Sequence, residues 1–395
     1  MAVNTIAAAP GRSTLRTPAM RTLRAAVVVG GFAQSLTGAA GALLAVAVTG
    51  SQAAAGLPAT ATVAGAGAAA ALSSQLVASL GRRRALSSGA GVAVAGSAAV
   101  AAGATASTLA PVLVGCALLG AGTAMVMLCR YAAAETVPEA LRPRAMASVL
   151  GATTIGAVAG PNLLAPASAA AASLGLPGLS GPFVFGALAF ACTAALLAAG
   201  LGDEKPAPAP PTNAAGAASP LPGLLVLGLS NLVMVGVMTM APLQIEHRHG
   251  GGLVAIGLVV SAHIAGMFAP STLSGRLVHR LGAAPTAMIA GTSMTAACAL
   301  AALGASSPWT LGAAMTILGV TWNLGLVSGS AMLTAAVPPA ARLKREGAGE
   351  VAMSIAAATG SLACGPLAAQ AGYPLLALTG AATALLIPTA LTLHR

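Results

Sequence analysis

Charged residues are scarce in this sequence. Only 6% of the 395 residues are Asp, Glu, Lys or Arg, whereas a soluble chain carries about 25%. This is too little charge to cover a water-facing globule of such length, and 57% of the residues are hydrophobic. Most of the surface must therefore face lipid, and the composition predicts an integral membrane protein.

The motifs of several other protein classes are missing. The five cysteines form no CxxC pair and no cluster, so neither a disulfide framework nor a zinc site is indicated. Neither lysine, Lys205 or Lys344, follows a glycine, which excludes the phosphate-binding loop of an ATP-driven pump. The HExxH motif or paired acids of a polytopic membrane enzyme are also absent. We therefore expect no enzymatic activity, no metal and no cofactor.

Apolar segments follow one another along the whole chain with short breaks between them. A helix of about 20 residues crosses the roughly 30 Å hydrocarbon core of a bilayer. A spanning chain must be helical, because it has to satisfy its own backbone hydrogen bonds. The segments predict an all-α membrane protein with twelve transmembrane helices, near 25–49, 57–79, 85–106, 109–131, 145–166, 181–201, 221–245, 253–275, 283–304, 308–336, 350–371 and 373–393.

Basic residues occupy every second loop. The intervening loops carry no charge, except for IEHRHGGG at 245–252. By the positive-inside rule, both termini are cytoplasmic and the number of spans is even. The net charge of +11 follows from this bias, so we expect the bilayer of the plasma (inner) membrane as a partner and no nucleic acid.

A segment rich in proline and alanine divides the chain near its midpoint. It reads GDEKPAPAPPTNAAGAASPLP, and such a composition is typical of a linker. The expected organisation is a cytoplasmic N-terminal tail at 1–24, a six-helix bundle at 25–201, this cytoplasmic linker at 202–222, and a second six-helix bundle at 223–395.

The two halves repeat a loop motif. The segment SSQLVASLGRRRAL (73–86) follows the second span, and LSGRLVHRLGAAPT (273–286) follows the eighth. Aligning Leu76 with Leu277 also aligns Gly81 with Gly282, 201 residues later. Duplicated halves with a site between them near the midplane are a recurring plan of membrane transporters.

These loops resemble the signature G-x-L-[AV]-D-R-x-G-R-[RK] of the major facilitator superfamily. The acidic residue of the signature is replaced by Ala78 and His279. The resemblance implies the major facilitator fold, with two pseudo-symmetric six-helix bundles, and a functional monomer that carries a small-molecule substrate by alternating access. The residues that match the signature, to which the resemblance gives a role in conformational change, are Leu76, Gly81, Arg82, Arg83, Gly275, Leu277, Arg280 and Gly282.

The fifth span contains a second motif, Gly156-x-x-x-Gly160-Pro161. It resembles the antiporter signature G-x-x-x-G-P of drug-exporting members of this superfamily. The glycines permit close helix contact, and the proline removes a backbone hydrogen bond, which makes a bendable gate. Ordinary packing of small residues is the alternative interpretation.

Two charged residues near the cytoplasmic side are further gating candidates. Arg130 lies at the cytoplasmic end of the fourth span, whereas the exporters carry an arginine early in that span. Glu350, near the start of the eleventh span, could pair with Arg342, Lys344 or Arg345 as a cytoplasmic gate, or could be a plain loop charge.

A histidine lies where a carboxylate would be expected in a proton-driven transporter. No Asp or Glu lies in the middle of any span, but His263 lies near the centre of 253–275. Its imidazole can change charge near neutral pH, so it could relay a proton or contact substrate. Alternatively, it donates a hydrogen bond to a neighbouring helix. The other mid-span polar residues that the resemblance assigns to the substrate cavity are Gln34, Ser35, Asn231, Thr239, Trp322 and Asn323.

Together these features predict a secondary transporter. The first hypothesis is proton-coupled export of small lipophilic compounds, with protons as the coupling ion. The alternative is uptake or facilitated diffusion of a metabolite such as a vitamin or nucleoside. A non-transporting receptor on the same fold is a third possibility.

Overall fold

The computed structural model describes residues 17–137, 142–202, 219–249, 252–334 and 339–393, which form helices and no β-strand. The predicted linker at 202–222 and tail at 1–24 lie largely outside this described part. The first helix, α1, begins at Pro18, inside the predicted tail. It begins there because the Thr17 side chain accepts a hydrogen bond from the Met20 backbone N–H, and proline suits the first helical turn.

The first half of the chain contains six spans, two of them divided. The fourth span is interrupted after Met127 and the fifth by a 3-10 turn. The helices are α1 (Pro18–Thr49), η2 (Gln52–Ala54), α2 (Leu57–Leu80), α3 (Arg82–Thr105), α4 (Leu109–Met127), α5 (Cys129–Glu135), α6 (Arg142–Ala159), η4 (Gly160–Leu163), α7 (Leu164–Ser173), η5 (Gly178–Ser180) and α8 (Gly181–Gly200).

The second half follows the same plan. Its helices are α9 (Leu221–His249), α10 (Gly252–Phe268), α11 (Ser271–Leu281), α12 (Ala283–Leu303), α13 (Pro308–Thr334) and α14 (Pro339–Leu393). The chain turns back inside α14 at Gly372, whose φ of 77° favours glycine.

The described helices match the twelve predicted spans. Ten stretches are long and apolar enough to cross a membrane, and the bent α10–α11 pair adds one more. The longest stretch, Gly347–Thr392, contains the turn at Gly372 and therefore supplies two spans. The prediction of an all-α fold with twelve membrane helices is confirmed.

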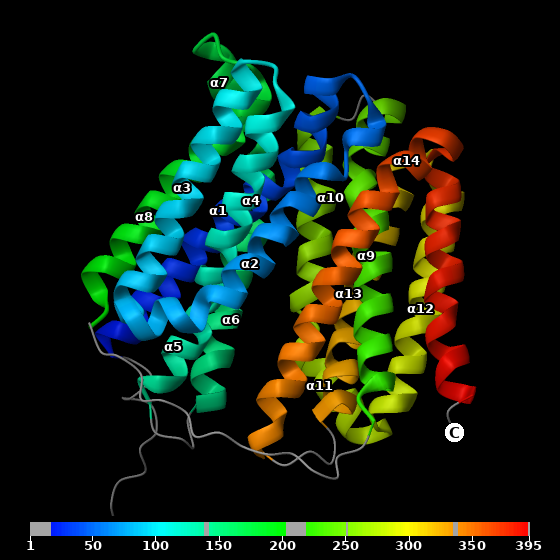
Figure 1. Ribbon diagram of the computed structural model, residues 1–395. Helices are drawn as coiled ribbons and strands as arrows, with labels where there is room; N and C mark the ends of the chain where they lie inside the picture. The colour runs from blue at the N-terminus through cyan, green and yellow to red at the C-terminus, as the bar shows by residue number, and fades with distance from the viewer. Residues whose placement is uncertain (1–16, 138–141, 203–218, 250–251, 335–338, 394–395) are drawn as a thin grey trace, which may run out of the picture.

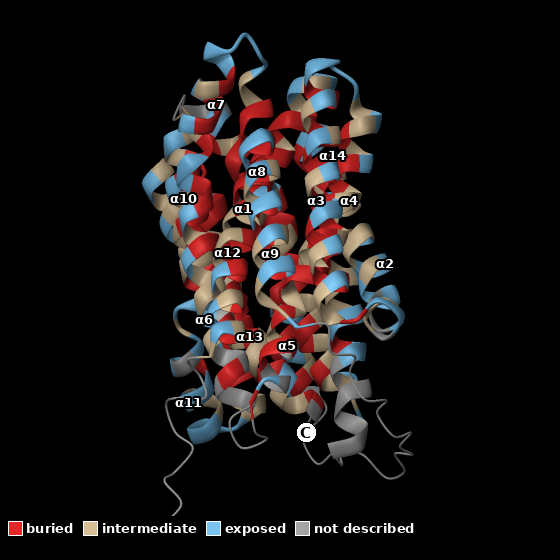
Figure 2. Cartoon of the chain, turned by 90° about the vertical axis from the view of Figure 1, so that its left-hand side faces the viewer, coloured by how far each residue is buried: buried red, intermediate tan, exposed pale blue. Residues whose placement is uncertain are grey.

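The helices of the two halves form two groups that lie side by side (Figure 1). The first described helix begins and the last one ends at the same end of the molecule, which we call the termini end; η2 and α7 lie at the opposite end, which we call the η2 end. Buried residues follow the inward faces of the helices, and exposed ones cover the outside (Figure 2). Exposed large side chains such as Ile155 and Leu188 are apolar, as lipid contact requires.

Candidate functional site

A cavity of about 480 Å³ lies between the two groups of helices. Its walls come from α1, α2, α4, α6 and α8 of the first half and from α9 and α10 of the second. Ligand cavities in proteins typically enclose about 300–1,000 Å³, so this one can hold a small organic molecule. None of its described lining residues is Asp, Glu, Lys or Arg.

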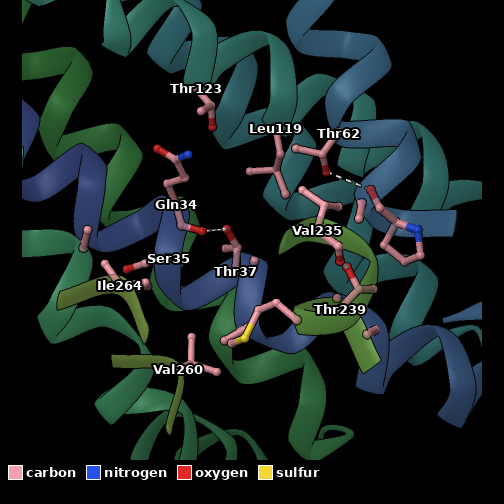
Figure 3. A pocket seen from close by; sticks show the side chains of 18 of the residues that line it. Gln34, Ser35, Thr37, Thr62, Leu119, Thr123, Val235, Thr239, Val260 and Ile264 are labelled. Carbon is pink, nitrogen blue, oxygen red and sulfur yellow. Dashed lines mark hydrogen bonds between the residues drawn. The ribbon is translucent and has the colours of Figure 1, made fainter. Parts of the chain in front are cut away.

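The polar groups of the cavity include an amide and several hydroxyls (Figure 3). Gln34 extends its amide from α1, and within the described part of the chain this amide makes no side-chain hydrogen bond. The hydroxyls of Ser35, Thr37 and Thr62 donate to carbonyl oxygens of their own helices at 3.2, 2.9 and 2.8 Å. Thr239 does the same to Val235 at 2.6 Å.

The apolar part of the wall is rich in methionine and contains two phenylalanines. Methionine is flexible and polarisable, so it adapts to ligands of different shape. The residues of this type that line the cavity are Met127, Phe183, Met234, Met238, Met267 and Phe268.

His263 lies in the cavity wall but is 2% exposed. Its Nδ1 lies 2.7 Å from the carbonyl oxygen of Met315 on α13. Because a carbonyl oxygen only accepts, Nδ1 carries the proton and donates it. The other ring nitrogen, Nε2, is buried and has no hydrogen-bond partner among the described residues. The imidazole thus joins α10 to α13 and keeps one basic nitrogen unused.

Three of the six predicted cavity residues line this cavity, namely Gln34, Ser35 and Thr239. The other three are not in its described wall and make interhelical hydrogen bonds instead. Trp322 Nε1 donates to Asn231 Oδ1 at 3.0 Å, and Asn231 Nδ2 donates to the carbonyl of Met353 at 2.7 Å. These bonds tie α13 and α9 to α14.

Asn323 is the third residue of this kind. Its Nδ2 donates to the Met267 carbonyl at 2.7 Å and to the Ser271 hydroxyl at 3.0 Å. Its Oδ1 accepts from the Ser274 hydroxyl at 2.6 Å. The amide therefore holds the bend between α10 and α11 against α13.

The motif of the fifth span packs against α1. A methyl group added at Gly156 would overlap the backbone oxygen of Val28, and one at Gly160 would overlap the Ser35 hydroxyl. Pro161 lies in η4, where the α-helix changes to a 3-10 turn. The glycines thus permit close contact with α1, and the proline coincides with a break in the span.

The signature loops have the same backbone shape in both halves. Gly81 and Gly282 adopt φ values of 80° and 92°, which a side chain would strain. Arg82 and Arg83 are partly buried at the start of α3, and Gly275 and Arg280 are exposed on α11, a helix that lies at the termini end (Figure 1).

The remaining charged candidates also lie apart from the cavity. Arg130 is partly buried in α5, and Glu350 is exposed on α14. The side chains of Arg342 and Lys344, two expected partners of Glu350, lie outside the described part of the structure.

The two halves contact each other closely at the η2 end. At the start of α2, a methyl group at Gly56 would overlap the backbone oxygen of Ser361 on α14. One turn further on, the hydroxyls of Thr60 and Ser361 share a hydrogen bond of 2.8 Å. This contact joins the second span to the eleventh.

A similar contact joins the eighth span to the fifth. A methyl group at Gly257 on α10 would overlap the backbone oxygen of Pro161. One turn further on, Ser261 accepts a hydrogen bond from Asn162 Nδ2 at 2.8 Å and donates one to the Val158 carbonyl at 2.8 Å. We call Gly56, Thr60, Ser361, Gly257, Ser261 and Asn162 the η2 latch.

The η2 latch was not predicted, although the sequence holds a signal for it. GLPAT (56–60) and GLVVS (257–261) share the pattern G-L-x-x-[TS] and lie 201 residues apart. This is the same offset that aligns the loop motif at Gly81 and Gly282. Extending that alignment toward the preceding spans would have found the latch, because both copies use a glycine for close approach and a hydroxyl one turn later.

Comparison with known proteins identifies the family. A sequence model of the Major Facilitator Superfamily matches residues 25–284. The uncharacterized MFS-type transporter YddS of Bacillus subtilis (strain 168) is 31% identical over 303 residues, which cover 71% of this chain and 69% of YddS. The riboflavin transporter RfnT of Brucella anthropi is 33% identical over 145 residues, 36% of each chain.

A solved structure agrees in fold over almost the whole length. The auto-inhibited peptide transporter of the POT family covers 95% of this chain and 96% of its own, with a TM-score of 0.70 and 13% sequence identity. These likenesses, and the twelve-span fold, confirm the resemblance read from the signature loops. The chain belongs to the Major Facilitator Superfamily of membrane transporters and is not an enzyme.

Proposed function

We propose that this transporter exports a small, moderately hydrophobic organic solute in exchange for protons. The observation that carries the proposal is the cavity between the halves, which is closed toward the η2 end by the latch. Alternating access then consists of opening the latch while the termini end closes. The export direction rests on the resemblance of Gly156-x-x-x-Gly160-Pro161 to the antiporter signature.

The proposed coupling group is His263. Its Nδ1 already donates to the Met315 carbonyl, so a proton arriving at Nε2 would leave this hydrogen bond intact. The imidazole could therefore gain and lose a proton without losing its place between α10 and α13. Because Nε2 is covered in the described conformation, the proton would reach it in another conformation of the cycle.

The proposed setting is the plasma (inner) membrane with both termini in the cytoplasm. The alternation of basic and uncharged loops supports this orientation. The η2 end then faces outward, and the described conformation is closed to the outside. We also propose that residues 25–201 and 223–395 move as the two bundles of a functional monomer, linked through 202–222.

A second candidate function is uptake or facilitated diffusion of a vitamin. It is favoured by the lack of a carboxylate among the described cavity residues, since burial makes a carboxylate a common proton carrier in such bundles. The partial relative RfnT is a riboflavin transporter, which makes riboflavin a defined probe for this candidate.

Proton movement in liposomes distinguishes the two candidates. Purified protein would be reconstituted with a pH-sensitive dye inside the vesicles and exposed to uncharged aromatic drugs or to riboflavin. The variants are His263→Gln, which keeps an N–H for the Met315 carbonyl, and the control His279→Gln on exposed α11.

We expect drug-dependent proton movement with the native protein and the control, and none with His263→Gln. Riboflavin flux without proton movement would refute proton-coupled export and support the second candidate. Proton movement that persists in His263→Gln would remove this histidine from the coupling mechanism. The absence of flux for every compound would refute transport of this solute class.

A further inference from the structure

We infer that the cavity selects uncharged solutes with an amide-like edge on a flat aromatic body, and that it rejects both cations and anions. This inference rests on the proposed function, because it takes the cavity as the substrate site. It names the class of substrate, which the family does not determine.

The first argument is the absence of charge from the wall. The described lining contains no Asp, Glu, Lys or Arg, and the His263 ring is already engaged with Met315 and almost fully covered. An ion in the cavity, which is closed only toward the η2 end, would lose part of its water without meeting an opposite charge. That penalty is large enough to weaken binding of an ion by roughly a hundredfold relative to an uncharged molecule of the same shape.

The second argument is the hydrogen-bonding capacity that is left over. Four hydroxyls of the wall already donate hydrogen bonds to backbone carbonyls, namely those of Ser35, Thr37, Thr62 and Thr239. They can therefore only accept further hydrogen bonds from a ligand. The Gln34 amide offers both N–H donors and a carbonyl acceptor, and the Thr123 hydroxyl near it (Figure 3) offers one more donor; neither side chain makes a hydrogen bond within the described part of the chain. A ligand that matches the Gln34 amide presents a donor beside an acceptor, as in an amide, imide or urea edge.

The third argument concerns the body of the ligand. Methionines contribute to the wall from both halves, with Met127 on α4, Met234 and Met238 on α9, and Met267 on α10. Phe268 adds an exposed aromatic ring, whereas Phe183 is buried behind the wall. Thioethers and rings both make favourable contacts with aromatic faces. A flat aromatic body held between the halves therefore uses this wall better than a sugar or a branched alkane.

The test uses three probes that share one ring system and differ in charge. Acridine-9-carboxamide is uncharged, its N-methylacridinium derivative is a permanent cation, and acridine-9-carboxylate is an anion. Their fluorescence anisotropy reports binding to the purified protein without any transport. We expect the carboxamide to bind at least about thirtyfold more tightly than either ion.

Two substitutions test the role of Gln34. Gln34→Leu should weaken binding of the carboxamide about tenfold, because the unpaired edge of the ligand then lacks a partner. Gln34→Glu should reverse the preference so that the cation binds more tightly than the carboxamide. The matched control is Gln75→Glu, at an exposed position of α2 outside the cavity wall.

Equal or tighter binding of an ion by the native protein overturns the inference, as does the binding of none of the three probes. Unchanged cation affinity in Gln34→Glu overturns the assignment of Gln34. Binding of the carboxamide without flux in liposomes leaves the selectivity standing and refutes the proposed function. Flux of the drugs together with preferential cation binding refutes the selectivity and leaves the proposed function standing.

Discussion

The hydrogen bonds of the η2 latch determine how strongly the two halves are held together at the η2 end. The perturbation is the double variant Thr60→Val with Ser261→Ala, which removes one latch hydroxyl from each symmetry-related contact. Neither change creates an overlap, because valine matches the shape of threonine and alanine is smaller than serine. When the Ser261 hydroxyl is removed, the Asn162 amide still donates to the Val158 carbonyl at 3.0 Å. The substitution at Ser261 therefore leaves the Asn162 donor paired.

The magnitude follows from the hydrogen bonds that join the halves. Thr60 makes one with Ser361, and Ser261 makes one with Asn162 and one with Val158. Interhelical hydrogen bonds in membrane proteins contribute about 0.6 kcal/mol each on average. In the double variant, the closed conformation should therefore lose about 2 kcal/mol of stability relative to the open one. This shifts the equilibrium toward the open latch by about twentyfold. An open state populated at about 5% would rise to about half of the molecules.

Spin labels on the two halves would measure this shift. Leu174 and Leu303 are 77% and 84% exposed and belong to different halves at the η2 end. Both would be changed to cysteine in a Cys192→Ser background, because Cys192 is the exposed cysteine among the described residues. Double electron–electron resonance should show a longer distance gaining population in the double variant.

A steric version of the same experiment uses the glycines. Gly56→Ala with Gly257→Ala should also favour the longer distance, because each methyl overlaps a backbone oxygen of the other half. Gly67→Ala is the control, since a methyl there meets no atom within 4 Å. If the distance distribution of both double variants equals that of the control, these contacts do not hold the halves together and the reasoning is refuted.

Two further predictions concern stability. Gly156→Ala should lower the melting temperature, because the methyl overlaps the Val28 backbone oxygen, while Gly151→Ala on the same helix should not, since its methyl has open space. Trp322→Phe should destabilise the protein by about 1–3 kcal/mol, because Asn231 Oδ1 then lacks its donor, yet it should leave ligand affinity unchanged. A loss of affinity in a stably folded Trp322→Phe protein would contradict the structural assignment of this tryptophan.

The sequence was sufficient to predict the helices, because the signals for spans are strong and local. Long apolar segments predict spans, the alternation of basic loops predicts an even number of them, and Gly81 and Gly282 indicate turns with positive φ between spans. The divisions of the spans were harder to foresee. Pro161 marks the break at η4, but nothing in the motif says that the α-helix changes to a 3-10 turn there.

The sequence could not separate cavity residues from interhelical ones. Gln34 and Asn231 are both amides in the middle of a span, and only one of them lines the cavity. In a soluble helix a polar stripe marks the face that meets water. These helices have lipid on the outside and small apolar residues on the inside, so no such stripe reveals how each one is rotated.

The sequence also could not reveal the hydrogen-bond partner of His263. The atom that receives its hydrogen bond is the backbone carbonyl of Met315, and every residue has such a carbonyl. No residue type at position 315 could have indicated the pair. A histidine with a side-chain partner would have left a second polar residue in the sequence to search for.

The cavity wall and the η2 latch share one property, which is the lack of charged side chains among their described residues. Buried ion pairs hold firmly once formed, but separating them leaves uncompensated charges that are costly. Hydroxyl bonds and glycine contacts are individually weak and break without that cost. A closed state favoured by about 2 kcal/mol is reversed by one uncharged solute if that solute binds the open conformation more than about thirtyfold more tightly than the closed one. The two halves can therefore open and close around a neutral ligand without any charge having to be buried.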